Sequence, residues 1–317
     1  MTRRGWLLFA AMGAIWGVPY LLIKVAVGEL TPPSLVLLRT GIGALVLLPI
    51  AVGRGQVRPL LRRWRWVLLF TVVELAVPWL LLAYAEQRLS SSLSGLLVAA
   101  VPFVGAVLAL ALGSEDRLDL RRAAGLLVGF SGVAALVGLD VSHSDPVAFV
   151  EIGIVTVGYA SGPVIIARRL VGLPSIGVVA VSLALTAVLY APIGIAQMPA
   201  HLPRTSVLLA VGTLGVVCTA LAFLLFFELI AELGPVRATV ITYVNPAVAL
   251  LLGVVVLGEP LTVGAGVGFA LILLGSFLAT RRPPSAGVAR AARTGSNDPV
   301  AAPSKPIGAA NVQELDQ

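Results

Sequence analysis

Two stretches of this sequence follow one pattern: SSSLSGLLVAAVPFVGAVLALALGSEDRL at residues 90–118 and GPVRATVITYVNPAVALLLGVVVLGEPLT at residues 234–262. Each enters an apolar run that contains a proline, Pro102 or Pro246, and an acidic residue follows thirteen positions later. An apolar segment that contains several glycines comes next in both copies. Few letters are shared, so the spacing carries the signal. It predicts an internal repeat of one structural unit.

The composition indicates an integral membrane protein. Of the 317 residues, 58% are hydrophobic and 12% are charged, whereas a soluble domain carries about 25% charged residues. Several apolar runs reach the roughly 20 residues that cross a bilayer. The net charge of +7 comes from basic residues between these runs, where such residues set membrane orientation. The chain is therefore predicted to contact a lipid bilayer and no nucleic acid.

The sequence offers little for metal, haem or disulfide chemistry. Its one cysteine, Cys218, lies in an apolar run, and its two histidines, His143 and His201, lie in predicted connections. A protein metal site needs several such ligands together. We therefore predict no metal, no cofactor and no intramolecular disulfide. The first apolar run lacks a small-residue cleavage site, so we expect it to remain as a helix.

Hydropathy and turn-forming residues divide the chain into ten predicted membrane spans. They cover approximately residues 6–27, 33–52, 65–85, 92–112, 121–139, 147–167, 174–196, 205–231, 236–257 and 262–280. Helices are the default spanning element, because lipid satisfies no backbone polar group. We therefore predict an all-α membrane protein with five-helix repeats at 1–139 and 147–280. Residues 281–317 are rich in Pro, Ala and Ser, which predicts a disordered cytoplasmic tail.

The basic residues predict the orientation of these spans. With a cytoplasmic N-terminus, eighteen of the 22 Lys and Arg residues fall inside, and only Arg88 and Arg204 fall outside. This asymmetry follows the positive-inside rule and predicts that both termini are cytoplasmic. Since each half has an odd number of helices, the second half starts on the opposite side of the membrane. Inverted repeats of this kind are typical of secondary transporters.

An ordered set of short motifs resembles the EamA-type branch of the drug/metabolite transporter superfamily. The set comprises Ala14-Ile15-Trp16-Gly17 with Lys24, Pro33 with Arg39, Pro102, and Leu257-Gly258-Glu259-Pro260-Leu261. The resemblance covers about residues 6–280. Two places depart from the family pattern: an extra residue in Leu112-Gly113-Ser114-Glu115, and Gly158-Tyr159-Ala160-Ser161-Gly162-Pro163 where a second Trp-Gly pair is expected.

The resemblance implies a function as well as a fold. It implies transport of a small organic solute, such as an amino acid, across the bacterial inner membrane and most often outward. A central cavity would be lined by helices of both halves. A multidrug or organic-cation exporter of the same fold is the alternative. The working unit, monomer or homodimer, stays open.

Glu74 is the acid that the predicted spans place deepest. It lies eight or nine residues into the third span, roughly 12–14 Å from the inner boundary at about 1.5 Å per residue. A charge at that depth costs a few kcal/mol and needs a partner or a function. We expect either a substrate contact and proton-coupling carboxylate, or a structural carboxylate hydrogen-bonded to a neighbouring helix.

Two basic residues also lie within spans. Arg39 is expected about 9 Å below the outer face, where it would bind a substrate carboxylate or hold helices together. Lys24 lies near the outer end of the first span, where it would attract anions or extend its ammonium to the interface.

Aromatic and proline residues complete the candidate cavity. Aromatic walls are expected from Trp16, Tyr20, Trp79, Tyr84, Tyr159, Phe223, Phe227 and Tyr243, although many such side chains in membrane proteins face lipid instead. Proline removes a backbone hydrogen bond and kinks helices. The candidate kinks or gates are Pro19, Pro78, Pro102 and Pro246, and the alternative is a fixed bend. Asn245, beside Pro246, is a further candidate substrate contact.

Other function classes find no support in the motifs. No G-x-x-x-x-G-K-[ST] loop occurs, so direct ATP hydrolysis is not predicted. An intramembrane enzyme would need H-E-x-x-H, paired aspartates or a Ser with an intramembrane His, and every Asp and His falls outside the predicted spans. The sequence therefore predicts a transporter and not an enzyme.

Overall fold

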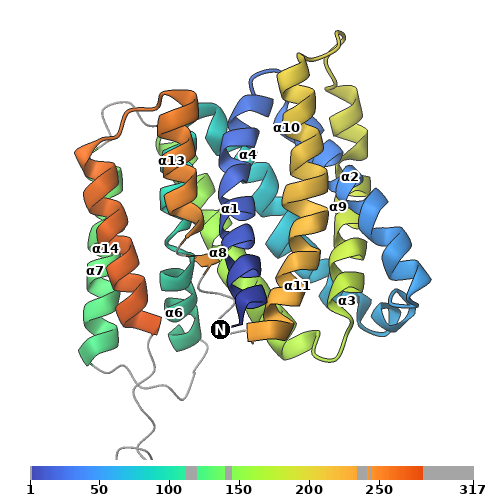
Figure 1. Ribbon diagram of the computed structural model, residues 1–317, viewed down its shortest axis with the longest axis horizontal. Coiled ribbons are helices and arrows are strands. Elements are labelled where there is room, and N and C mark those ends of the chain that lie inside the picture. The colour runs from blue at the N-terminus through green and yellow to red at the C-terminus, as the bar shows by residue number, and fades with distance from the viewer. Residues whose placement is uncertain (1, 112–119, 140–144, 234–240, 243, 281–317) are drawn as a thin grey trace, which may run out of the picture. The chain divides into compact units, whose positions relative to one another are not determined.

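The computed structural model describes residues 2–111, 120–139, 145–233, 241–242 and 244–280, and these residues form helices without any strand (Figure 1). The chain divides into two units, Met1–Thr280 and Arg281–Gln317, and the described helices belong to the first. The predicted all-α class is confirmed for this part of the chain.

The elements follow one another along the chain with short connections. They are α1 (Arg3–Ala26), α2 (Pro32–Gly53), the 3-10 turn η1 (Arg58–Arg63), α3 (Trp64–Phe70), the π-helix η2 (Thr71–Ala76), α4 (Val77–Arg88), α5 (Ser91–Val98), α6 (Val101–Ala111), α7 (Leu120–Leu139), α8 (Pro146–Arg169), α9 (Ser175–Ala196), α10 (Thr205–Gly215), the π-helix η4 (Val216–Leu221), α11 (Ala222–Leu233), α13 (Asn245–Leu257) and α14 (Val263–Thr280).

Seven helical runs in the described residues are long and apolar enough to cross a membrane. They are Arg3–Ala26, Pro32–Gly53, Arg58–Arg88, Ser91–Leu108, Pro146–Arg169, Ser175–Ala196 and Thr205–Leu233. Shorter apolar helices occupy Ala123–Ala135, Asn245–Leu257 and Val263–Gly275. Large apolar side chains such as Leu45, Phe130 and Val188 stay exposed on these helices, as expected for side chains that face lipid.

Three predicted spans are not single continuous α-helices. The run Arg58–Arg88 and the run Thr205–Leu233 each contain a π-helix in the middle. The predicted span 92–112 is interrupted at Ala99 and Ala100, between α5 and α6. Pro102 is the second residue of α6, a position where proline fits because its missing N–H has no partner inside the helix.

Helices from the first and second halves of the sequence pack against each other. α2 packs along α9, α4 along α8, and α13 against both α1 and α5. α7 and α14 lie side by side at one edge of the view in Figure 1. Their contact is close because glycines meet there: a Cβ on Gly275 would overlap the backbone of Gly129, and one on Gly132 would lie 2.9 Å from the Gly268 carbonyl oxygen. Small residues allow such close helix contacts.

The connections meet in two groups at the helix ends. Arg204, before α10, forms an ion pair with Glu29, between α1 and α2. Arg63, before α3, donates to the carbonyl oxygens of Arg169 and Val171, near the end of α8, at 2.9 and 3.0 Å. The two groups lie at opposite ends of α2, because 27–31 precedes this helix and 54–63 follows it.

Candidate functional site

Glu74 lies in the π-helix η2, and the sequence around it explains the irregular backbone. Pro78 has no N–H to donate to the carbonyl four residues earlier, which is that of Glu74. The preceding residue, Val77, donates its N–H to the carbonyl of Val72, five residues back, rather than to a carbonyl four residues back as in an α-helix. Such single-turn π segments often occur at functional sites. Here the segment carries an acid into an apolar run.

The Glu74 side chain lies against the backbone of α8. A Cβ on Gly162 would overlap the Glu74 carboxylate, and a Cβ on Gly158 would overlap the Val73 carbonyl oxygen and lie 2.7 Å from Pro78. These two glycines therefore make room for η2. Within the described residues, the buried Oε2 atom of Glu74 has no hydrogen-bond partner.

Arg39 is a buried cation on α2. Its side chain is 7% exposed, its Nε donates to the Thr219 hydroxyl oxygen at 3.1 Å, and its guanidinium carbon lies 3.7 Å from the centre of the Trp79 ring. Among the described residues, no carboxylate lies within ion-pair distance of Arg39. The stacked ring and the hydroxyl hold the guanidinium without neutralising it.

Tyr159 lies within electrostatic range of both charged residues. It lies on α8 and interacts electrostatically with both Arg39 and Glu74 and directly with the Trp79 side chain. It also packs against two apolar clusters of the described residues. Arg39, Glu74, Trp79 and Tyr159 therefore form one group, which we call the central group, contributed by α2, η2, α4 and α8.

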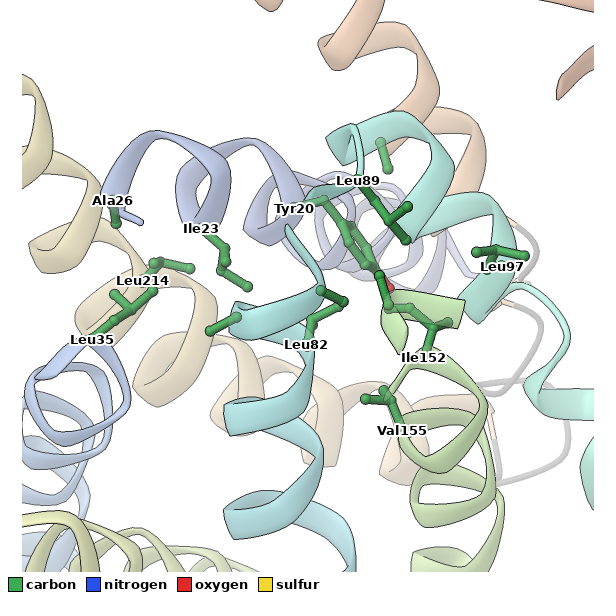
Figure 2. Close-up of a cluster of buried hydrophobic side chains, with 14 of the residues drawn as sticks. Tyr20, Ile23, Ala26, Leu35, Leu82, Leu89, Leu97, Ile152, Val155 and Leu214 are labelled. Carbon is green, nitrogen blue, oxygen red and sulfur yellow. The ribbon is translucent and has the colours of Figure 1, made fainter. Parts of the chain in front are cut away.

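Tyr20 borders the central group from α1. It is 8% exposed and interacts electrostatically with Arg39 and Tyr159. Figure 2 shows its ring in a cluster with Leu82 of α4 and Ile152 of α8.

Trp16 packs against α11. Its ring centre lies 4.7 Å from that of Phe226 and 6.0 Å from that of Phe223. Trp16 is four residues before Tyr20, and Phe223 is four residues after Thr219, so each lies one turn from a residue at the central group. These aromatic side chains extend the group towards α11.

Asn245 and Tyr243 were the remaining candidate contacts. With its amide nitrogen turned towards the backbone, Asn245 donates to the carbonyl oxygens of Ile241 and Gly13 at 3.0 and 3.3 Å. It thereby links α13 to α1. Tyr243 lies outside the described residues.

The four candidate kinks occupy different places in their helices. Pro19 is inside α1, which continues without a break to Ala26. Pro78 directly follows η2, Pro102 lies just after the break between α5 and α6, and Pro246 is the second residue of α13.

Sequence reasoning missed Glu86 and the supporting residues Thr219 and Gly162. The third span was expected to end at residue 85, whereas α4 continues to Arg88 and buries Glu86 completely. An acid one turn from the end of an apolar run was the available signal. The roles of Thr219 and Gly162 depend on helices far apart in sequence, which no local pattern specifies.

The long apolar helices define a polytopic helical membrane protein, and acidic and basic side chains are buried between them. The model of the EamA-like transporter family matches this chain twice, at residues 3–138 and 151–281. The chain belongs to the EamA-like transporter family.

Individual relatives agree with this assignment. The uncharacterized inner membrane transporter YedA of Escherichia coli strain K12 is 29% identical over 296 residues, which are 89% of this chain and 95% of YedA. An uncharacterized transporter of Archaeoglobus fulgidus is 24% identical over 285 residues, covering 87% of this chain and 99% of that protein. A solved crystal structure with a TM-score of 0.62 and 25% identity covers 87% of this chain and 96% of its own. The protein is thus a multi-pass inner membrane transporter.

Proposed function

We propose that this protein is a secondary transporter that exports a small organic metabolite, such as an amino acid, by alternating access. Its ten spans would form two inverted five-helix repeats, residues 1–139 and 147–280, with both termini in the cytoplasm. The solute would bind at the central group, and Glu74 would carry the coupling proton.

Equivalent helix contacts occur in both halves of the chain, and they support the repeat. In chain order, α1, α2, the run α3–η2–α4, the pair α5–α6 and α7 correspond to α8, α9, the run α10–η4–α11, α13 and α14. α1 contacts α13 and α11, and its counterpart α8 contacts α6 and α4. α2 contacts α10 and η4, and its counterpart α9 contacts α3 and η2. A two-fold axis between two repeats requires this exchange.

The contacts at the helix ends support inversion of the repeats. The Glu29–Arg204 pair joins the connection before α2 to the one after α9. The bonds from Arg63 join the connection after α2 to the one before α9. Counterpart connections therefore lie at opposite ends of the bundle, as an inverted repeat requires.

The observation that carries the proposed substrate is the unneutralised guanidinium of Arg39, which stacks on the Trp79 ring and belongs to the same group as Tyr159 and Glu74. Arginine presents a planar fork that binds a carboxylate through two parallel hydrogen bonds. The Glu74 carboxylate, which lies against Gly162 of α8, would accept a substrate ammonium. An amino acid carries both groups on one carbon, and Trp79 and Tyr159 would contact its side chain.

The surroundings of Glu74 support proton coupling. A carboxylate that lacks a donor inside a membrane protein is costly while charged. A substrate ammonium would offset that cost, and so would a proton. Competition between ammonium and proton for one carboxylate would couple export of the solute to proton entry.

An organic-cation exporter is the second candidate. It is favoured by the rings of Trp16, Phe223, Phe226 and Phe227, which contact one another beside α1 and α11. Aromatic faces attract cations. This substrate would need Glu74 but not Arg39.

Transport by purified protein in vesicles tests these proposals. Amino acids, sugars and cationic drugs would be offered with and without a pH gradient, to wild type, Glu74→Gln and Glu228→Gln. Glu228 is an exposed acid on α11, so its variant is a matched control. We expect export of an amino acid that responds to the pH gradient in wild type and Glu228→Gln only. Normal pH-dependent transport by Glu74→Gln would exclude Glu74 as the proton carrier. Failure of correctly oriented wild type to move any solute would contradict the transporter mechanism.

A further inference from the structure

A second acid lies inside the helices, twelve residues after Glu74. Glu86, in the last turn of α4, is 0% exposed. Both of its carboxyl oxygens are buried without a hydrogen-bond partner in the described residues. A carboxylate stripped of both water and donors is strongly destabilised while it is charged.

The nearest cation does not bind this carboxyl group. Lys24 of α1 donates from its Nζ to the main-chain carbonyl oxygens of Glu86 and Leu89, both at 2.7 Å. Carbonyls at the end of a helix have no partner within it, so Lys24 caps the end of α4. No ion pair between Lys24 and Glu86 occurs within 4.0 Å in the described chain.

Other charged and titratable groups surround Glu86 without satisfying it. Its electrostatic neighbours are Lys24 and Tyr20 of α1, Arg39 of α2, Tyr159 of α8 and Glu259 after α13. From α5, packed against α4, Ser94 presents a hydroxyl that is itself buried without a partner. On the next residues of α4, Arg88 is already paired with Glu151 and Asp145.

Glu259 contrasts with Glu86 because its own charge is fully satisfied. Its carboxylate accepts from the backbone N–H groups of Ser91 and Ser92, at 2.7 and 2.9 Å, and from both serine hydroxyls. These donors are the start of α5, where a negative charge is favoured. A satisfied anion at Glu259 opposes a second negative charge at Glu86.

We propose that Glu86 is a second proton-binding site, occupied in this conformation and emptied towards the outer side when the ends of α1 and α4 separate. The inference rests on the proposed alternating-access function. In the release step, the O–H bond of the Glu86 carboxyl group breaks and the proton passes to entering water. The carboxylate then pairs with the Lys24 ammonium, which leaves the carbonyls at the end of α4. No other reactant takes part.

The arrangement gives Lys24 two alternative partners. While Glu86 is neutral, the ammonium binds α4 carbonyls and ties α1 to α4. Once Glu86 is charged, the carboxylate is the stronger partner. Protonation of Glu86 would therefore favour the conformation in which these helix ends are joined, and loss of the proton would favour their separation.

Infrared spectroscopy of the purified full-length protein tests the site without needing transport. The carbonyl stretch of a protonated carboxylic acid would be followed during a pH titration of wild type, Glu86→Gln, Glu74→Gln and Glu228→Gln. We expect wild type and Glu228→Gln to show a band at neutral pH that is lost in Glu86→Gln and kept in Glu74→Gln. Where Glu86→Gln fails to fold, Glu86→Asp replaces it, and a shifted band is expected. Identical neutral-pH bands in wild type and a folded Glu86 variant would overturn the proposal.

Lys24 provides a second test of the same site. Because Lys24→Met removes the cation that would receive the carboxylate, the Glu86 band should persist to higher pH than in wild type. A band that responds to pH as in wild type would contradict the exchange of partners. These spectra also separate this inference from the proposed function. If vesicles show transport that is indifferent to a pH gradient, proton coupling fails, whereas the spectra still decide whether Glu86 holds a proton.

Discussion

Arg39 is buried and has no carboxylate partner among the residues that the structure describes. A buried cation usually pairs with an anion of the protein, but here a ring and a hydroxyl hold it, from Trp79 and Thr219. The buried acid Glu74 lies against Gly162 of α8 and, among the described residues, forms no ion pair with the guanidinium. Because the two side chains do not neutralise each other, both would be available to the proposed substrate.

Replacing Arg39 with lysine should weaken binding of carboxylate-bearing solutes. Lysine keeps the charge but loses the planar fork, the stacking on Trp79 and the bond to Thr219. A hydrogen bond to a charged group contributes about 1.5–3 kcal/mol, so the apparent affinity should fall about tenfold or more. Initial export rates over a range of solute concentrations would measure this fall. An unchanged affinity in Arg39→Lys would place the carboxylate elsewhere.

Substitution of Gly162 by alanine should displace Glu74. The added methyl would overlap the Glu74 carboxylate on the surface of α8, and overpacking costs about 1–3 kcal/mol. We expect a folded protein with strongly reduced pH-dependent export. Gly153→Ala is the matched control, because it lies in the same helix and a Cβ there meets nothing within 4 Å. Equal transport by both alanine variants would show that the position of Glu74 is not critical.

At the element scale, the two π-helices occupy corresponding places in the runs Arg58–Arg88 and Thr205–Leu233. Each is bonded to the second helix of the opposite half. Thr71 of η2 donates to the Ser182 hydroxyl of α9 at 2.9 Å, and Thr219 of η4 accepts from Arg39 of α2. Ser182 and Arg39 are both the eighth residue of their helices. The central group therefore forms where the irregular elements of one half meet the regular helix of the other.

The end of α13 positions a carboxylate for α5. Gly258 adopts a left-handed backbone with φ of 68°, a conformation that glycine takes without strain. The Glu259 N–H then bonds the Gly253 carbonyl at 3.0 Å, and the Glu259 side chain reaches the start of α5. The sequence motif Gly-Glu-Pro thus acts through the fold as a cap for a distant helix.

Loss of this cap should destabilise the protein. In Glu259→Gln, an amide nitrogen would face the donors of Ser91 and Ser92, and the charge would be lost. We expect a cost of about 1.5–3 kcal/mol, seen as a lower thermal unfolding temperature in detergent. The control is Glu228→Gln, which breaks an exposed pair with Arg4 and should change stability by about 0.5 kcal/mol or less. Equal unfolding temperatures for the two variants would contradict the capping role.

Over the whole molecule, periodicity and composition predict the apolar helices well, because bilayer thickness demands long apolar runs. They also single out Arg39 and Glu74, because a charge in such a run has to be explained by a partner or a function. Other features depend on tertiary contacts. Pro78 offers a local reason for η2, whereas η4 has no proline at the corresponding position. Sequence analysis does not identify Glu86, because the apolar run ends before the buried part of α4 does. Burial at this end of α4 depends on contacts with α1, α5 and α8.

The proposed inverted repeat makes a prediction about two equivalent positions. Arg62 lies between α2 and α3, and His201 lies between their counterparts α9 and α10. Both are exposed. If the repeats are inverted, these residues face opposite sides of the membrane, whereas repeats of parallel orientation would place them on the same side. The sides of these two residues therefore distinguish the two architectures.

Single cysteines make this measurable, because the chain has one native cysteine and Cys218 is 2% exposed. In a Cys218→Ala background, a membrane-impermeant maleimide added to intact cells should label His201→Cys but not Arg62→Cys. Permeabilised cells should show labelling of both, which confirms that each site is reactive. The positive-inside asymmetry requires this direction, since Arg62 lies among the basic residues predicted to be cytoplasmic. Labelling of Arg62→Cys alone would reverse the orientation but keep the inversion. Labelling of both variants in intact cells would rule out inverted repeats, and with them a rocking motion of two inverted halves about the central group.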